Sequence, residues 1–206
     1  MSAAPRTLAD AIRGMDERQL VALLMARPDL AQPRPTSWAD LVDRAGSPTS
    51  AAMAVDRLDT WQRAVAEALA TASEPTTARA LAGLLDAEVP AVQAAFDALT
   101  ARALAWSSNT RTRSVQLSRA AAMAFGPYPA GLAQPSPVPL SMQAIDQALA
   151  QADRQEHEVL QRLVWQPLGR LRNAQRPITL ANAATASERL VARKLLRPIA
   201  DDSVVL

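Results

Sequence analysis

The chain has 206 residues, of which 49% are apolar and 3% aromatic, and its formal net charge at neutral pH is +2. This apolar content is too high for a disordered protein, and because it is mostly Ala, Leu and Val it favours helices over strands. The absence of cysteine excludes disulfides and thiolate metal sites. With no signal-peptide pattern and no apolar run near the roughly 18–20 residues of a membrane span, we expect a soluble, cytoplasmic (nucleoid-associated) protein.

The expected fold class is mainly α with short β-hairpin wings, in tandem helix-turn-helix or winged-helix units. Residues 1–60 form a helical region with a helix-turn-helix-like pair. Gly46 ends the first helix of the pair, and Ser47 caps a second helix that begins at Pro48. The apolar side of this second helix comprises Met53, Val55 and Leu58.

Residues 61–125 repeat this pair and extend it. A helix over 61–71 precedes a helix that Thr76 or Thr77 caps, and a third helix over 89–102 has apolar residues at three- and four-residue steps. Residues 104–117 then alternate around a polar tip, which predicts a β-hairpin. Three helices followed by a hairpin predict a winged-helix domain over 61–125.

A Pro-rich linker is expected over 126–140, and a second winged-helix-like domain over 141–206. Helices are predicted over 145–149, 153–165 and 185–196, with Ser187 as a cap of the last. Residues 196–199 and 204–206 resemble two strands around a turn at Asp201 and Asp202. Because the chain stops in or just after the second strand, we expect the protein to continue beyond Leu206.

Positive charge increases along the chain. Residues 1–75 hold 8 Arg and 10 acidic residues, residues 76–150 hold 5 Arg and 4, and residues 151–206 hold 9 basic and 6 acidic residues. The planar guanidinium of arginine is well shaped to bind phosphate and guanine, although a GC-rich genome would also raise the arginine content of the protein. The candidate DNA-binding residues lie in the hairpin tip, in a basic loop and near the last helix: Asn109, Arg111, Thr112, Arg113, Arg170, Arg172, Arg176, Arg193 and Lys194.

Two cations among hydroxyls on a hairpin tip suit phosphate or minor-groove contact, and a merely solvated tip is the alternative. The helix over 89–102 is the candidate recognition helix, but it begins beside Glu88 and offers Gln93 and Asp97 with no cation in its first half. A major-groove reader would carry donors there. The sequence therefore predicts backbone contact without strong sequence reading.

Catalytic and metal motifs are not found in the sequence. The single histidine, His157, is flanked by Glu156 and Glu158, but adjacent helix positions point apart and do not form a metal cluster. There is no Gly-rich phosphate loop. We therefore expect a non-enzymatic protein with no cofactor. Three tryptophans at element ends are expected in cores (Trp61, Trp106 and Trp165), while Trp38 is expected either in a core or as a partner contact.

Several segments resemble the N-terminal region of actinobacterial helicase-associated proteins that carry an XPB-type helicase-like domain. They are residues 8–30 ending in Arg27-Pro-Asp-Leu, then Asp56-Arg-Leu-Asp, Gly126-Pro-Tyr-Pro-Ala-Gly-Leu and Arg176-Pro-Ile. The resemblance implies a much longer protein with winged-helix modules, a helicase or the rest of a larger polypeptide as partner, and a role in DNA repair. The alternatives are a protein-interaction scaffold that docks a helicase and a winged-helix transcription regulator.

Overall fold

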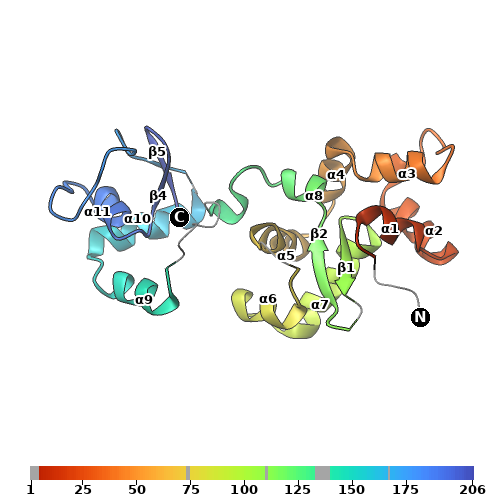
Figure 1. Ribbon diagram of the computed structural model, residues 1–206, viewed down its shortest axis with the longest axis horizontal. Helices are drawn as coiled ribbons and strands as arrows, with labels where there is room; N and C mark the ends of the chain where they lie inside the picture. The colour runs from red at the N-terminus through yellow and green to blue at the C-terminus, as the bar shows by residue number, and fades with distance from the viewer. Residues whose placement is uncertain (1–4, 73–74, 110, 133–139, 167) are drawn as a thin grey trace. The chain divides into compact units, whose positions relative to one another are not determined.

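The structure is a computed structural model that describes residues 5–72, 75–109, 111–132, 140–166 and 168–206 (Figure 1). It is mainly helical, with two small antiparallel sheets. The chain divides into two compact units, Met1–Pro129 and Ala130–Leu206, here called unit 1 and unit 2. Within the described residues, every helix is too short or too polar to cross a bilayer.

Unit 1 begins with short helices that pack around a small core of their own. They are α1 (Leu8–Arg13), α2 (Glu17–Ala26), the 3-10 helix η1 (Pro28–Leu30) and α3 (Trp38–Ala45). The side chains of Thr7, Asp16 and Ser37 cap the three α-helices by accepting bonds from backbone N–H groups. Their core is formed by Ile12, Leu23, Leu30, Leu41 and Ala45, joined by Ala103.

Arg27 is fully buried between these helices and the rest of unit 1. Its guanidinium donates to the backbone oxygens of Arg102 at 3.1 Å and Ala45 at 3.2 Å, and to the hydroxyl of Ser50 at 2.5 Å. The Ser50 hydroxyl in turn contacts the Asp29 carboxylate. Burial lowers the pKa of the Arg27 guanidinium, which the charge of Asp29 opposes. These contacts of Arg27 therefore stabilise the fold of unit 1.

The larger core of unit 1 is built from helices α4 (Pro48–Val55), α5 (Thr60–Thr71), α6 (Ala78–Leu85), α7 (Val89–Ala101) and α8 (Arg119–Met123). The predicted N-cap Ser47 with Pro48 at the first helical position is confirmed, and Thr77 caps α6. Ala51, Ala54 and Val55 of α4 lie in this larger core. This core therefore contains residues from both sides of residue 60, where the sequence predicted a domain boundary. Helix α8 was not predicted from the sequence.

A hairpin of β1 (Ala105–Asn109) and β2 (Ser114–Leu117) completes unit 1. Thr76, in the segment between α5 and α6, pairs with Val115 of β2: each residue's N–H donates to the other's oxygen, at 3.0 and 2.9 Å. The order along the chain is therefore α5, Thr76, α6, α7 and the β1–β2 hairpin. In space, β2 lies between Thr76 and β1.

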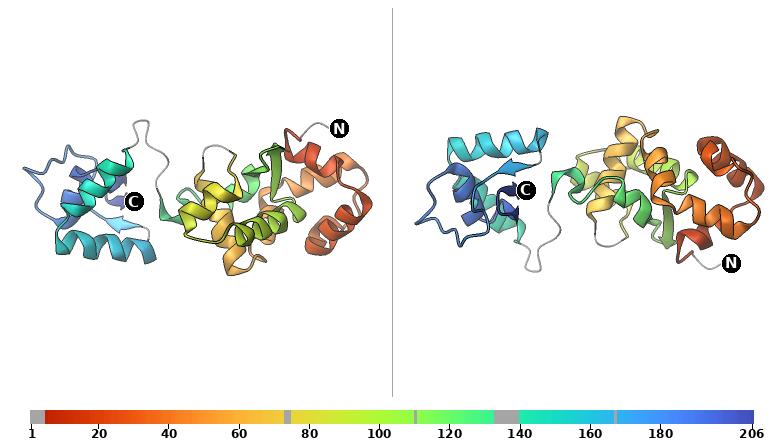
Figure 2. Two further views of the ribbon diagram at one scale, coloured as in Figure 1. Left: turned by 90° about the horizontal axis from the view of Figure 1, so that it is seen from below. Right: turned by 90° about the horizontal axis from the view of Figure 1, so that it is seen from above.

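Unit 2 contains α9 (Met142–Ala150), α10 (Arg154–Trp165), β3 (Gly169–Arg170), α11 (Ala186–Ala192), β4 (Arg197–Ala200) and β5 (Ser203–Val205). The strands form an antiparallel sheet in the order β3-β5-β4, and α10 lies beside it in each view (Figure 2). The core comprises Leu163, Leu171, Ala174, Leu190, Leu196 and Val204. The η2 turn (Pro129–Gly131) spans the junction of the two units.

Two sequence predictions for unit 2 need correction. Thr185 rather than Ser187 caps α11, and the helix ends at Ala192, with Lys194 in the left-handed region at a φ of 61°. Trp165 was expected in a core but is 86% exposed, because Leu163 already fills the core side of α10. Of the other tryptophans, Trp106 is 8%, Trp61 36% and Trp38 47% exposed.

The two units share an order of elements. In unit 1, α5 is followed by Thr76, which pairs with β2, and α7 is followed by the β1–β2 hairpin. In unit 2, α10 is followed by β3, which pairs with β5, and α11 is followed by the β4–β5 hairpin. In both units the second hairpin strand has a pairing partner on each side. They differ in the second helical position, where unit 1 has α6 and unit 2 has turns over residues 171–184. Pro177 in this stretch disfavours a regular helix.

Candidate nucleic-acid interface

The turn of hairpin β1–β2 carries two of the predicted DNA-binding arginines. Arg111 and Arg113 are both exposed, and the Thr112 hydroxyl between them donates to the hydroxyl of Ser114 at 3.1 Å. The sequence from 105 to 117 contains no carboxylate. Arg113 has a φ of 51°, a conformation that costs a non-glycine residue about 1–2 kcal/mol and that the hairpin must hold.

Asn109 was also predicted to contact DNA. Its backbone pairs with Ser114 at an irregularity in the hairpin, whereas its side chain and all of Thr110 lie outside the described residues. Arg111, Thr112 and Arg113 therefore lie together on the exposed turn that connects β1 and β2, and this turn is positively charged.

The helix before this hairpin offers no positive charge. The sequence of α7 contains neither Arg nor Lys, and its Gln93 amide donates to the Asp97 carboxylate at 2.9 Å. Two apolar side chains are exposed beside it, Leu84 of α6 (79%) and Val89 of α7 (41%), with exposed Asp86 and Glu88 between them in the chain. The cations available to DNA phosphates near this helix are therefore those of the hairpin turn, and α7 itself offers no charged donor to guanine.

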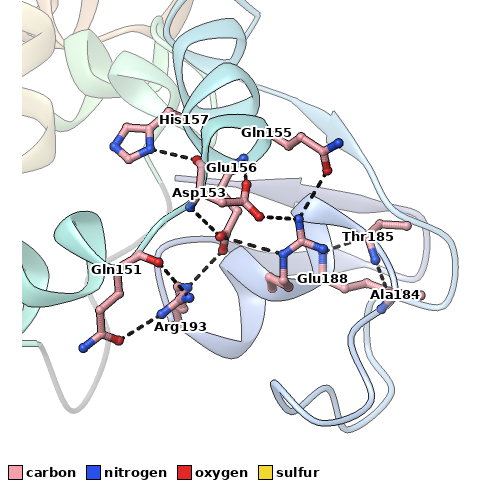
Figure 3. Close-up of polar contacts among 10 residues, drawn as sticks. Gln151, Asp153, Gln155, Glu156, His157, Ala184, Thr185, Glu188 and Arg193 are labelled. Atoms are coloured by element: carbon pink, nitrogen blue, oxygen red, sulfur yellow. Dashed lines mark hydrogen bonds and ion pairs between the residues drawn. The ribbon is translucent and has the colours of Figure 1, made fainter.

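Unit 2 uses several arginines for internal contacts (Figure 3). Arg193, whose side chain is 15% exposed, donates from Nε to Glu156 at 3.0 Å and from its two other nitrogens to the side chain and backbone of Gln151 at 3.1 and 3.0 Å. Arg176 donates to the Glu188 carboxylate at 2.5 Å. Both arginines were predicted to contact DNA, and in the structure both bond to carboxylates of the same unit.

Glu156 is the centre of this internal network. It is 1% exposed, accepts the backbone N–H of Asp153 at 2.9 Å, and lies 3.8 Å from Arg189 Nε of α11. Arg189 also donates to the Asp153 carboxylate at 2.9 Å. These contacts tie α11 to the first turn of α10, so Arg189 and Arg193 serve packing of the two helices.

Two carboxylates of the network have shifted pKa values. The backbone N–H of Glu156 holds the pKa of Asp153 below its ordinary value; desolvation opposes this shift, and the charge of Arg189 adds to it. The backbone N–H groups of Ala184 and Thr185, followed by Arg176, lower the pKa of Glu188. Both carboxylates therefore favour the charged form in the folded state.

The other predicted contact residues of unit 2 remain on the surface. Arg170, Arg172 and Lys194 are exposed. The turn of the β4–β5 hairpin, however, carries exposed Asp201 and Asp202, whose backbone oxygens accept the N–H groups of Ala174 and Leu171 at 2.8 and 2.9 Å. This hairpin turn is negative where that of unit 1 is positive.

The described residues include no group of three or more His, Cys, Asp or Glu side chains that could hold a metal ion. His157 is exposed, and its ring Nδ1 lies 2.9 Å from the backbone oxygen of Asp153. The feature that sequence reasoning missed is the exposure of Trp165 together with Val164 and Leu168. The three apolar residues Leu163, Val164 and Trp165 follow one another, and helical geometry allows only part of such a run to face one core.

The chain matches no known family model, and neither a similar curated protein nor a similar solved structure was found.

Proposed function

We propose that the chain is a non-catalytic DNA-binding module of winged-helix type, and that hairpin β1–β2 of unit 1 contacts the phosphate backbone of duplex DNA. The observation that carries this proposal is the exposed pair Arg111 and Arg113 on a hairpin turn with no carboxylate in its sequence. Cations on such a turn can reach phosphates on either side of a groove.

The order of elements in unit 1 supports the winged-helix assignment. In this class a helix, a short strand, two helices and a hairpin follow one another. Here α5, Thr76, α6, α7 and the β1–β2 hairpin occur in that order, and Thr76 pairs with the second hairpin strand. The hairpin then corresponds to the wing, and α7 to the helix that would lie nearest the groove.

The charges of this surface favour binding that is nearly independent of sequence. Phosphate contacts position a protein but do not distinguish bases, and α7 lacks the charged donors that read guanine. Because such binding releases counterions, the affinity falls steeply as salt is raised. A transcription regulator would need base-reading side chains that α7 does not offer.

The proposal extends to a biological setting through the resemblance of the sequence to helicase-associated proteins. The module would deliver a helicase, or the remainder of a larger polypeptide, to DNA during repair at the nucleoid. This part rests on the segments named above, of which Arg27-Pro-Asp-Leu has a structural role because Arg27 and Leu30 are fully buried.

The test is duplex binding measured by fluorescence anisotropy with the full chain. Replacing both Arg111 and Arg113 by Ala should lower the affinity about tenfold at moderate salt, equally for unrelated sequences, and should reduce the salt slope by about 2. The matched control replaces the exposed Arg79 and Arg119 of unit 1, which should change the affinity by less than half as much on a logarithmic scale. Unchanged affinity in the R111A/R113A variant would overturn the proposal.

A specific observation also favours a second candidate, protein docking by the surface of α6 and α7. Leu84 and Val89 are exposed there, and Trp61, 36% exposed, donates from Nε1 to the Ala91 oxygen of α7 at 3.2 Å. Exposed apolar side chains on adjacent elements are typical of partner contacts. Replacing Leu84 by Asp should abolish co-elution with a helicase partner, at salt that prevents DNA binding, while leaving duplex affinity unchanged.

A further inference from the structure

Unit 2 exposes three apolar side chains at and just after the C-terminal end of α10. Trp165, the last residue of the helix, is 86% exposed, and Val164 and Leu168 are 67% and 60% exposed. The core side of the helix is filled by Leu163, which is 4% exposed. An indole is among the largest apolar side chains and is mostly covered in folded proteins. Trp165 therefore does not pack in the core of unit 2, and packing does not explain a tryptophan at this position.

Exposed arginines flank this tryptophan along the chain. Arg162 precedes it by three positions, which places the two side chains on one face of α10. Arg170 and Arg172 follow it and are also exposed. From residue 159 to residue 187 the sequence contains four arginines and no Asp or Glu. Of these four, Arg176 is the one that bonds to Glu188.

The position of β3 directs Arg170 outward. A Cβ at Gly169 would lie 3.1 Å from Leu163 Cδ2 and 3.0 Å from Val204 Cγ2, so that residue faces the core. Successive residues of a strand face opposite sides, and Arg170 therefore points away from the core. Gly169 allows β3 to run close against α10, which keeps Arg170 near the end of that helix.

The carboxylates of α10 are distant from this surface or already paired, whereas exposed Asp201 and Asp202 lie beside it on the strand-side turn, where their backbone oxygens accept the N–H groups of Ala174 and Leu171. Glu158 is the nearest on α10, seven residues or about 10 Å before Trp165, and it bonds to Arg154 at 3.0 Å. Glu156 is 1% exposed and bound to Arg193. The surface formed by Arg162, Val164, Trp165, Leu168, Arg170 and Arg172, here called the Trp165 surface, therefore combines exposed apolar side chains with three arginines, and Asp201 and Asp202 lie at its Arg172 side.

We propose that the Trp165 surface binds an unpaired strand of nucleic acid, with a base stacked on the Trp165 indole and phosphates held by the neighbouring arginines. Unpaired bases present flat apolar faces and carry a phosphate at each step, and exposed aromatic rings among cations are the usual means of binding them. The partial negative charge of the α10 C-terminus directs the phosphates toward Arg170 and Arg172 rather than over the helix end. This proposal is independent of the hairpin of unit 1.

The test uses the full chain and labelled oligomers of thymidine and of uridine, each about 20 nucleotides long so that they cover at least one site. Replacing Trp165 by Ala should lower the affinity for both oligomers by about tenfold or more, and Trp165→Phe should restore most of it because a phenyl ring still stacks. The R170A/R172A variant should weaken binding and flatten its salt dependence. Trp38→Ala, at the other strongly exposed tryptophan, is the matched control and should have no effect.

Far-UV circular dichroism checks that the variants fold, which the 86% exposure of Trp165 predicts. Equal affinity of the wild type and W165A for both oligomers would overturn the proposal, as would a W165F variant as weak as W165A. A response by only one of the two oligomers would support the site and restrict it to that nucleic acid. The duplex affinity of W165A separates the two proposals, because it should remain that of the wild type while that of R111A/R113A falls about tenfold.

Discussion

Units 1 and 2 order their elements similarly but use arginine differently. In unit 1 the hairpin turn presents Arg111 and Arg113 to solvent, and the preceding helix α7 has no cation. In unit 2 the hairpin turn presents Asp201 and Asp202, and the two arginines near the end of α11 bond to carboxylates of α10. Two similar orders of elements thus carry opposite charge on their hairpin turns, so the order of elements alone does not assign DNA binding to either unit.

Each arginine can be sorted by how far its side chain is buried. Where it is buried and bonds to carbonyl or carboxylate groups of the same unit, its removal should reduce stability. Where it is exposed on a turn, its removal should reduce affinity for phosphate and leave stability nearly unchanged. Of the four predictions that follow, in order of decreasing expected effect, the first two test this division, the third tests the acidic turn of unit 2 and the fourth tests two carboxylates of unit 2.

Arg27→Ala should destabilise unit 1 by about 3–5 kcal/mol, because it leaves a cavity and removes the donor to three acceptors, two of them in buried contacts. Chemical denaturation followed by circular dichroism measures the change. Arg34→Ala, at an exposed arginine of the same unit, is the control and should cost less than about 0.5 kcal/mol. Equal stability of the two variants would show that burial does not separate these arginines.

Glu156→Gln should destabilise unit 2 by about 2 kcal/mol, because a buried carboxylate that binds Arg193 and caps α10 loses its charge. The same substitution at Glu158, which is 55% exposed on its side chain, should cost less than about 0.5 kcal/mol. Denaturation of both variants measures the difference. A cost at Glu158 as large as that at Glu156 would contradict the assignment of Arg193 to the core network.

Charge reversal at the turn of unit 2 should raise duplex affinity. In the D201K/D202K variant the β4–β5 turn would resemble the turn of unit 1, and we expect affinity to increase about three- to fivefold at low salt. The backbone bonds from Ala174 and Leu171 to this turn do not depend on the side chains and should persist. Anisotropy titrations measure the gain, and D201N/D202N should give about half of it. No gain in either variant would mean that the acidic turn does not limit contact.

The smallest expected effect is a dependence of stability on pH. Because folding lowers the pKa of Asp153 and Glu188, each carboxylate stabilises unit 2 above its ordinary pKa near 4 and loses this contribution as the pH falls toward the folded value. Thermal unfolding between neutral pH and about pH 3 measures the loss. The Glu188→Gln variant should lose less than the wild type over this range, and an identical loss would contradict the role of Glu188.

Much of the local structure follows from short-range patterns. Ser47 followed by Pro48 predicted the start of α4, and Thr77 was one of two residues predicted to cap α6. Alternation of apolar and polar residues predicted the β1–β2 hairpin. Caps and alternation depend on neighbours within about four residues, which a single sequence displays.

Long-range partners could not be predicted in this way. Arg193 bonds to Glu156, 37 positions away, and Arg27 contacts the backbone of Arg102, 75 positions away. No local pattern distinguishes these arginines from Arg113, so the sequence analysis placed Arg193 and Arg176 among the DNA contacts. The exposure of Trp165 was missed for the same reason, since its helix also offers Leu163 to the core.

The central claim is that the turn of β1–β2, and not helix α7, meets the DNA backbone. Titration of the isotope-labelled chain with a short duplex, followed by backbone amide NMR, tests it most directly. We expect shift changes that are largest over residues 105–117 and that disappear in the R111A/R113A variant, with little change over residues 88–94. Changes concentrated at the start of α7 with an unperturbed hairpin would contradict the account.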